Sequence, residues 1–251
     1  MDNGVRVSPA HRGEYGVDGN IYGVLGISIF TIGLIVLAVY RFQTGHRSVA
    51  IAASIGAASL LFTIAVYLHT TRRGKFAVWA DILDQLQLRG DERVLDIGCG
   101  RGAVLMLTAK AVPRGRVVGL DIWSRADQSG NSRASAEANL AAEGVSDRCE
   151  LTHADMRAMP FPDASFDLVV SSLAIHNVMH RDGRSAAIAE IARVLKPGGR
   201  VAIADLAHTG TYARCLEEHG LTGIRRRSLG WRFWWAPGMA TRLITATKPA
   251  A

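Results

Sequence analysis

Two long apolar runs near the N-terminus restrict what this chain can fold into more than any other feature. Residues 21–40 and residues 49–68 are each uncharged, and each has the length that a helix needs to cross the hydrocarbon core of a bilayer. The short polar link between them leaves room only for a turn, so we expect a transmembrane hairpin (21–68) after an N-terminal tail (1–20). A secretory signal peptide would have a shorter apolar stretch and a cleavage site. A pair of buried soluble helices would need a much larger protein around it.

Basic residues are more numerous on the outer flanks of the hairpin than in its turn. The flanks carry Arg6, Arg12, Arg72, Arg73 and Lys75, whereas the turn carries Arg41 and Arg47. Because Lys and Arg in short flanks favour the cytoplasmic side, this bias predicts a multi-pass membrane protein with both termini in the cytoplasm. Everything after the hairpin would then lie on the cytoplasmic face.

The remainder of the chain, residues 75–251, alternates short apolar strands with helical segments. Such alternation predicts an α/β domain with a mostly parallel, doubly wound sheet. An amphipathic helix begins near Phe76, and another helix is expected over residues 103–112. The expected strands are residues 93–97, 116–120, 150–152, 167–171, 200–205 and 241–247.

A glycine-rich turn, VLDIGCGRG, follows the first of these strands at residues 94–102. Gly98, Gly100 and Gly102 remove side chains where a strand passes into a helix, so a ligand can approach the exposed backbone N–H groups. Dinucleotide-binding enzymes use a similar turn, but their spacing is GxGxxG rather than GxGxG. Asp96, two residues before the first glycine, also argues against a dinucleotide site. So does Asp121 at the end of the next strand, where its carboxylate can accept hydrogen bonds from both ribose hydroxyls.

Four segments taken together resemble the successive motifs of class I S-adenosylmethionine-dependent methyltransferases. They are DIGCGRG, GLDIW, HADMRAMPFPDASFDLVVSS and RVLKPGGRVAIADL, in that order. Within this class the resemblance is greatest to the quinone-biosynthesis and small-molecule group. It implies a Rossmann-like, seven-stranded sheet whose last strand is antiparallel, and S-adenosylmethionine as the cofactor.

The resemblance also assigns cofactor contacts around the glycine turn. Asp96 and the backbone of Gly98 and Gly100 would hold the methionine end, and Gly102 would complete the turn. The carboxylate of Asp121 would accept hydrogen bonds from the ribose hydroxyls. An aspartate before a glycine turn can also serve only to cap the turn.

Further contacts are implied at the adenine and at the reacting sulfonium. Ile122 would pack on the adenine ring, and Asp155 would accept from the adenine amino group beside the N–H of Met156. Ser172, at the end of the fourth strand, would face the sulfonium. Met156 has an alternative interpretation as an ordinary core residue.

Three polar residues near the expected carboxyl edge of the sheet are candidates for catalysis. His176 is the candidate general base because its side chain titrates in the physiological range, and Asn177 could orient an acceptor oxygen. Asp205, after the fifth strand, is a second choice. His176 could equally pack or cap a helix start. The segment WRFWW at residues 231–235 is expected to form a strand with Trp231, Phe233 and Trp235 on one face.

The formal charge of +7 and a pI of about 9.8 favour an anionic partner such as a lipid surface or nucleic acid. The three scattered cysteines form no CxxC pair, so we expect no metal site. These features predict a membrane-anchored methyltransferase that acts on a small, lipophilic acceptor and contacts membrane lipid. The alternatives are a membrane module that binds the cofactor without catalysis, a nucleotide-dependent oxidoreductase and an RNA methyltransferase. The hairpin argues against the RNA methyltransferase.

Overall fold

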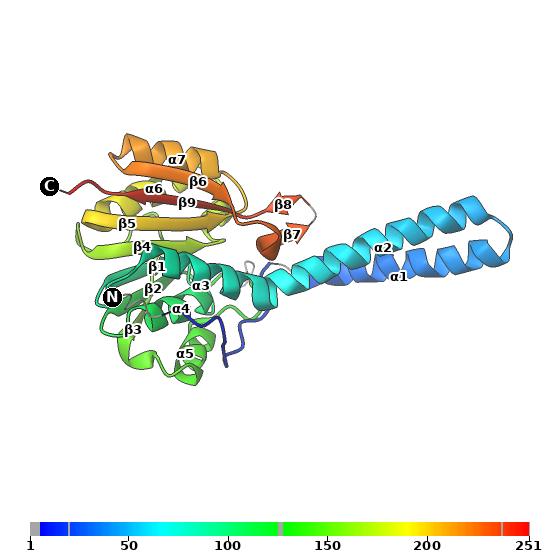
Figure 1. Ribbon diagram of the computed structural model, residues 1–251, viewed down its shortest axis with the longest axis horizontal. Coiled ribbons are helices and arrows are strands. Elements are labelled where there is room, and N and C mark those ends of the chain that lie inside the picture. The colour runs from blue at the N-terminus through cyan, green and yellow to red at the C-terminus, as the bar shows by residue number, and fades with distance from the viewer. Residues whose placement is uncertain (1–5, 20, 125–127, 237, 251) are drawn as a thin grey trace.

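The computed structural model describes residues 6–19, 21–124, 128–236 and 238–250. Two parts are evident: an α/β body and a long helical hairpin that projects from one end of it (Figure 1). The expected hairpin and α/β fold are therefore both present, with the hairpin helices slightly longer than predicted.

The hairpin consists of α1 (Ile21–Gln43) and α2 (Arg47–His69), which pack along each other. Small residues on α2 lie at this contact, since Ala50, Ala53 and Ala57 are buried whereas the remaining residues of the helix are exposed or half-buried. Both helices are long and apolar enough to cross a membrane, and only 11% and 17% of their most apolar 18-residue windows is buried. The apolar side chains of the hairpin therefore point mostly outward rather than into a protein core.

Helix α2 continues without a break into the α/β body. A π-helical turn (Thr70–Gly74) joins it to α3 (Lys75–Leu86). A Cβ atom at Gly74 would lie 1.8 Å from the carbonyl oxygen of Arg232, so only glycine permits this approach of the C-terminal segment to the helix. Residue 75, where we expected the catalytic domain to begin, therefore lies inside one continuous helical rod.

The body is built on a seven-stranded sheet in the order β3-β2-β1-β4-β5-β9-β6. Its pairs are parallel except that β9 runs antiparallel to both β5 and β6. This is the topology that the resemblance implied. The strands are β1 (Arg93–Ile97), β2 (Arg116–Asp121), β3 (Cys149–His153), β4 (Phe166–Ser172), β5 (Leu195–Asp205), β6 (Thr222–Ser228) and β9 (Arg242–Thr247).

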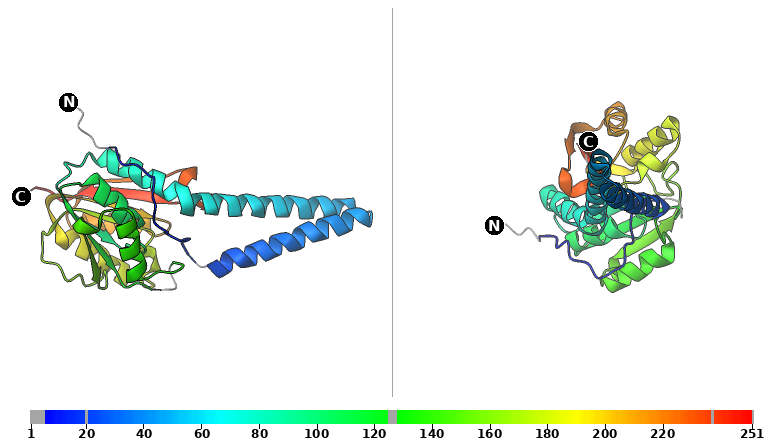
Figure 2. Two further views of the ribbon diagram at one scale, coloured as in Figure 1. Left: turned by 90° about the horizontal axis from the view of Figure 1, so that it is seen from below. Right: turned by 90° about the vertical axis from the view of Figure 1, so that its right-hand side faces the viewer.

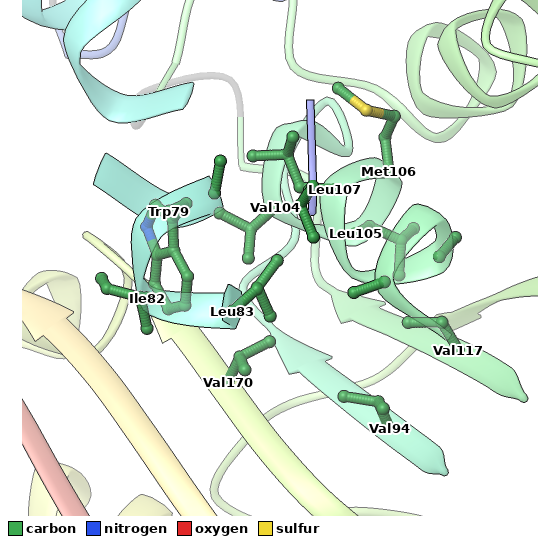
Figure 3. Packing of buried hydrophobic residues seen from close by; sticks show 14 of the residues in the cluster. Trp79, Ile82, Leu83, Val94, Val104, Leu105, Met106, Leu107, Val117 and Val170 are labelled. Atoms are coloured by element: carbon green, nitrogen blue, oxygen red, sulfur yellow. The ribbon is translucent and has the colours of Figure 1, made fainter. Parts of the chain in front are cut away.

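Helices cover both faces of the sheet, which is why its central strands are almost entirely buried. Neighbouring residues point to opposite faces, so Val94 joins one core cluster and Leu95 the other. Trp79 of α3 packs on the first face above Val94 and Val170 (Figure 3). The first face carries α3, α4 (Ala103–Ala111) and α5 (Arg133–Ala142), and the second carries α6 (Arg181–Val194) and α7 (Thr209–Glu218).

The C-terminal region departs from the sequence-based expectation in two places. Strand β6 was not expected, because its residues are almost all exposed and include three successive arginines, so the apolar alternation of a strand is missing. Residues 231–235 do not form one strand. A 3-10 turn (Trp231–Phe233) follows Gly230, whose φ is +72°, and only then does β7 (Trp234–Ala236) pair with β8 (Met239–Ala240).

Candidate active site

A cavity of about 710 Å³ opens at the carboxyl edge of the sheet, where open α/β sheets bind ligands. The loops after β1, β2 and β4 meet there, because these strands are parallel neighbours. Ten of the twelve predicted site residues line it: Asp96, Gly98, Gly100, Asp121, Ile122, Asp155, Met156, Ser172, His176 and Asn177. The other two, Gly102 and Asp205, lie behind its surface.

The glycine turn adopts a conformation that requires glycine. Gly98 and Gly100 have φ values of +69° and +53°, in the left-handed region that other residues avoid. A Cβ atom at Gly98 would lie 2.1 Å from that of Ala174, and one at Gly100 would lie 2.6 Å from Oε1 of Gln128. Gly102, with φ of +84°, precedes α4 as its N-cap. Its part in the site is therefore to shape the backbone.

Asp96 is a buried acid at the floor of the cavity. Its side chain is 1% exposed, and neither carboxylate oxygen makes a hydrogen bond within the described part of the chain. Burial, and then the negative charge of Asp121, raise the pKa of Asp96 to about 8. An unpaired buried carboxylate is unfavourable unless a cation approaches it. Asp96 therefore fits the cationic methionine end of S-adenosylmethionine.

Asp121 joins the glycine turn to the loop that follows β2. Its carboxylate accepts from the N–H of Gly100 at 2.7 Å and from the N–H of Trp123 at 2.5 Å. Trp123 in turn donates its indole N–H to the carbonyl of Gly100 at 3.1 Å. Two loops are thus fixed around one carboxylate at the end of β2, the position where the ribose hydroxyls were expected. Sequence reasoning did not identify the role of Trp123.

The adenine end of the predicted site is apolar on one side and ionic on the other. Ile122 is 54% exposed beside the cavity, and Met156 packs partly on the second core cluster. The guanidinium of Arg157 binds both carboxylate oxygens of Asp155 at 2.6–3.0 Å. This pairing, working against burial, lowers the pKa of Asp155. Asp155 is therefore a charged acceptor at the surface.

His176 and Asp205, predicted as separate alternatives, form one unit. Nδ1 of His176 lies 2.5 Å from Oδ1 of Asp205, and the N–H of His176 donates to Oδ2 at 3.1 Å. Asp205 is completely buried and also accepts from Leu206 N and the Tyr212 hydroxyl. Burial, and then the negative charge of Asp205, raise the pKa of Tyr212. The carboxylate thus lies against the imidazole, although Nδ1 makes no hydrogen bond to any residue that the structure describes, and Asn177 next to it is exposed at the cavity.

Lys75 and two residues of the N-terminal tail, Asp18 and Gly19, line the cavity and were missed by sequence reasoning because they lie far from the motifs in the chain. Trp235, for which the sequence allowed core packing, a wall over the substrate site or a membrane-interface patch, lines the cavity as well. Ser172, which was predicted, accepts a hydrogen bond at 2.9 Å from the indole of Trp79 on α3. The cavity therefore extends from the glycine turn to the base of the helical hairpin. No local motif marks the missed residues.

Across the ranges that the structure describes, no cluster of three or more His, Cys, Asp or Glu side chains is placed to hold a metal ion. The three cysteines are free, and two of them are buried. Burial raises the pKa of the Cys99 thiol next to the glycine turn well above its usual value. The thiol of Cys99 is therefore protonated at neutral pH.

Residues 95–203 match the model of the family described as "Methyltransferase domain". This match covers less than half of the chain, and the sheet topology and the glycine-turn cavity agree with the class I S-adenosylmethionine-dependent methyltransferase fold. These similarities support S-adenosylmethionine as the cofactor.

Two relatives are similar to the chain in sequence, and one solved structure is similar to it in fold. The chain is 34% identical over 138 residues to "Sterol 4-C-methyltransferase strm-1" of Caenorhabditis elegans, covering 55% of this chain and 38% of that protein. It is 36% identical over 136 residues to "Ubiquinone/menaquinone biosynthesis C-methyltransferase UbiE" of Pseudomonas putida, covering 53% and 50%. The chain thus spans half or less of these relatives' length. The fold also matches the "[4+2]-Cyclase SpnF" with a TM-score of 0.57 at 19% identity, over 72% of this chain and 83% of that one.

Proposed function

We propose that this chain is a membrane-anchored methyltransferase that transfers the methyl group of S-adenosylmethionine to a small, lipophilic acceptor, with His176 as general base. The observation that carries the proposal is the shared cavity. The cofactor residues, the His176–Asp205 unit and the base of an apolar hairpin all border one space of about 710 Å³. A volume of this size is typical of small-molecule sites.

The geometry around His176 supports its role as the base. When bound, S-adenosylmethionine supplies an already activated methyl group, so the protein has to position the acceptor and remove its proton. Because Asp205 lies against Nδ1, the Nε2 atom is the ring nitrogen left to accept a proton from an acceptor. The exposed amide of Asn177 would hold an acceptor oxygen. A positioned base of this kind contributes about 10²–10⁴-fold to the rate.

The outer surface of the hairpin supports membrane insertion. Large apolar side chains are exposed along both helices, among them Ile29 at 70%, Phe30 at 63% and Ile55 at 66%. A continuous apolar surface of this extent is unfavourable in water and is expected where a protein meets lipid. The close packing through alanines is also a common feature of helix contacts in membranes.

The charge distribution supports a cytoplasmic catalytic domain. Arg72 and Arg73 are exposed where α2 meets the body, but Lys75 is buried in an ion pair with Asp18 and therefore does not count as a flanking surface charge. Arg6, Arg12, Arg72 and Arg73 on the flanks still outnumber the two arginines in the turn, so the charge bias favours both ends of the hairpin on the cytoplasmic side. The cofactor would be available there.

The extent of the cavity supports a lipophilic acceptor. Trp235 lines it, and its ring packs edge to face against Tyr67 at the end of α2, with centroids 5.9 Å apart. Nearby, Trp231 is 64% exposed and stacks on His69. Tryptophan and tyrosine are favoured where a protein meets the head groups of a bilayer. One relative is named for a sterol and another for ubiquinone/menaquinone biosynthesis, and these are apolar molecules.

The deciding experiment uses the full-length protein in lipid nanodiscs with methyl-labelled S-adenosylmethionine. One sample receives a total membrane-lipid extract and a second receives the polar metabolites of the same cells. We expect label in an apolar product, and we expect the variant His176→Gln to bind S-adenosylhomocysteine but transfer little label. Label confined to polar metabolites would contradict the lipophilic acceptor.

A second candidate is a membrane module that binds the cofactor and does not transfer its methyl group. The fold is shared with a cyclase, and one fold can carry unrelated reactions, so cofactor motifs alone do not require methyl transfer. The two candidates differ in one measurement. The non-catalytic module would bind S-adenosylhomocysteine tightly, yet neither extract would become labelled.

A further inference from the structure

The N-terminal tail is part of the α/β body. Residues 6–19, which we call the N-terminal strap, run along the end of the body from which the hairpin projects, before the chain enters α1 (Figure 2). Val7 and Tyr15 of the strap are 7% and 4% exposed and belong to the first core cluster. The strap is therefore packed as an element of the domain, although it precedes the hairpin in the chain.

Hydrogen bonds fix the strap to α5 and the residue after it. The carboxylate of Glu143 accepts from the N–H of Arg12 at 2.6 Å and of Gly13 at 2.9 Å, and pairs with Lys110 at 2.8 Å. Burial alone would raise the pKa of Glu143, but Lys110 and the two N–H donors lower it overall. The amide of Asn139 exchanges two hydrogen bonds with the backbone of Glu14. Charged acceptors of this kind make strong hydrogen bonds.

One strap residue must be glycine for the strap to lie this close to the cofactor loops. Gly16 has a φ of +61°, and a Cβ atom there would lie 2.7 Å from Nη1 of Arg101 and 2.8 Å from Oγ of Ser129. Arg101 belongs to the glycine turn, and Ser129 is bound to the backbone of Val17 at 3.2 Å. The middle of the strap is therefore in direct contact with the loops that form the cavity.

The end of the strap reaches the cavity itself. Asp18 lines it and binds Nζ of Lys75 at 2.8 and 3.0 Å, in a pair whose side chains are only 17% and 5% exposed. Its carboxylate also accepts from Nε2 of Gln128 at 3.0 Å. The other end of the same amide, Oε1, accepts from the N–H of Arg101 at 3.2 Å. Gln128 therefore links Asp18 directly to the glycine turn.

Asp18 also connects the two ends of the hairpin. It lies three residues before α1, whereas Lys75 is the first residue of α3, beyond α2. The hydroxyl of Tyr67, in the last turns of α2, donates to the carbonyl of Asp18 at 2.6 Å. One residue thus joins the entry of the hairpin, its exit and, through Gln128, the cofactor turn.

We propose that the N-terminal strap is a wall of the cofactor site and that Asp18 is a positioning residue which couples the glycine turn to the base of the hairpin. Cofactor binding then stabilises the strap in place, and a bound strap strengthens cofactor binding by the same factor. This inference rests on the cofactor assignment. It is independent of the identity of the acceptor and of the role of His176.

Limited proteolysis tests the coupling, because the strap carries a trypsin site at Arg12. Full-length protein in detergent is digested with and without saturating S-adenosylhomocysteine, and cleavage after Arg12 is followed by mass spectrometry. We expect the cofactor product to slow this cleavage about tenfold, within the usual range of coupling between sites. Equal cleavage rates, with binding confirmed by calorimetry, would overturn the proposal.

Two variants distinguish coupling from simple loss of structure. Gly16→Ala displaces the strap without altering a cavity side chain, so it should weaken binding of S-adenosylhomocysteine about tenfold and speed cleavage after Arg12. Gln128→Ala leaves the Asp18–Lys75 pair in place, so its thermal unfolding should stay close to that of the wild type while protection of Arg12 by the ligand is lost. Glu14→Gln, at an exposed strap side chain, is the control and should change neither quantity.

The outcomes separate this proposal from the proposed function. Failure of the unaltered protein to bind S-adenosylhomocysteine would overturn the cofactor assignment and the coupling together. Normal binding that is insensitive to Gly16→Ala and to Gln128→Ala would overturn the coupling alone. Methyl transfer to any acceptor is not needed for either result.

Discussion

Asp205 lies with Oδ1 2.5 Å from Nδ1 of His176, and its other oxygen accepts from the N–H of the same histidine at 3.1 Å. One buried carboxylate therefore holds the backbone of the residue that borders the cavity and contacts its ring. Because Asp205 ends β5 and His176 follows β4, their contact depends on the pairing of these parallel strands. The arrangement leads directly to a prediction about catalysis.

Replacing His176 with Gln should lower kcat by about 10²–10⁴-fold, because the side chain that accepts the proton is lost. The affinity for S-adenosylhomocysteine should stay within about twofold, since the cofactor contacts lie on other loops. Asp205→Asn should also lower kcat, because an amide would favour the wrong tautomer of the imidazole. Single-turnover assays with the labelled acceptor and calorimetry measure the two quantities. A kcat for His176→Gln equal to that of the wild type would exclude the base.

Asp96→Asn should weaken cofactor binding while it stabilises the empty protein. The pKa of Asp96 is about 8 in the folded chain and about 3.9 in an unfolded one. The folded state therefore holds a proton that the unfolded state releases, so this contribution to stability is full below about pH 4 and is lost as the pH rises towards 8. Asn cannot ionise and avoids that loss, so the variant should unfold at a higher temperature than the wild type at pH 8.

Binding should show the opposite dependence on pH. A carboxylate is needed to attract the cationic end of the cofactor, so the affinity of the wild type for S-adenosylhomocysteine should increase as the pH rises from 6 to 8. Calorimetry at pH 7 in two buffers should detect the release of a proton on binding. A pH-independent affinity, or Asp96→Asn binding as tightly as the wild type, would contradict this role.

Gly98→Ala should destroy the site, and Gly144→Ala provides a matched control. The two glycines have nearly equal φ values of +69° and +68°, so each substitution incurs the same backbone strain of about 1–2 kcal/mol. Only at Gly98 would the new Cβ meet another atom, since the surroundings of Gly144 are open. Gly98→Ala should therefore lose more stability and weaken cofactor binding more than tenfold. Thermal unfolding and calorimetry test this, and equal effects of both variants would contradict it.

Charges placed on the hairpin should release the protein from membranes. Ile32 and Ile55 are 61% and 66% exposed, and lysine within a membrane-spanning helix costs about 2.5–3.5 kcal/mol per residue. The double variant Ile32→Lys/Ile55→Lys should shift to the soluble or aggregated fraction after alkaline extraction. Thr222→Lys, on the exposed edge strand β6, should stay with the membrane like the wild type. Equal membrane retention of both variants would argue against insertion.

The local sequence pattern was sufficient to predict those helices and strands whose residues have the same surroundings along the whole element. The central strands are buried on both faces and appear in the sequence as apolar runs. The hairpin helices appear in it as long uncharged runs. Strand β6 could not be predicted in this way, because Arg225, Arg226 and Arg227 are exposed and carry no alternation. The tryptophan segment was predicted as a strand because its turn depends on Gly230 and on the close approach of Arg232 to Gly74.

The candidate site was predicted best where its residues belong to one continuous motif. The glycine turn and the acids beside it were found because their spacing is local, whereas the link from Asp18 through Gln128 to Arg101 joins residues 110 and then 27 positions apart. His176 and Asp205 were both identified, but as alternatives, since only the strand pairing shows that they touch. Gly102, predicted among the cofactor residues as part of the turn, is the N-cap of α4, and its role in cofactor binding stays a prediction.

The unbroken rod from Arg47 to Leu86 has a mechanical consequence. Its 40 residues extend over about 60 Å, twice the thickness of the hydrocarbon layer. If its first half spans the bilayer as proposed, the second half acts as a lever arm, since α3 carries Trp79 and through it Ser172. A thinner or thicker bilayer changes the tilt of such a helix. The orientation of the active site towards the lipid surface would then depend on the lipid composition of the membrane.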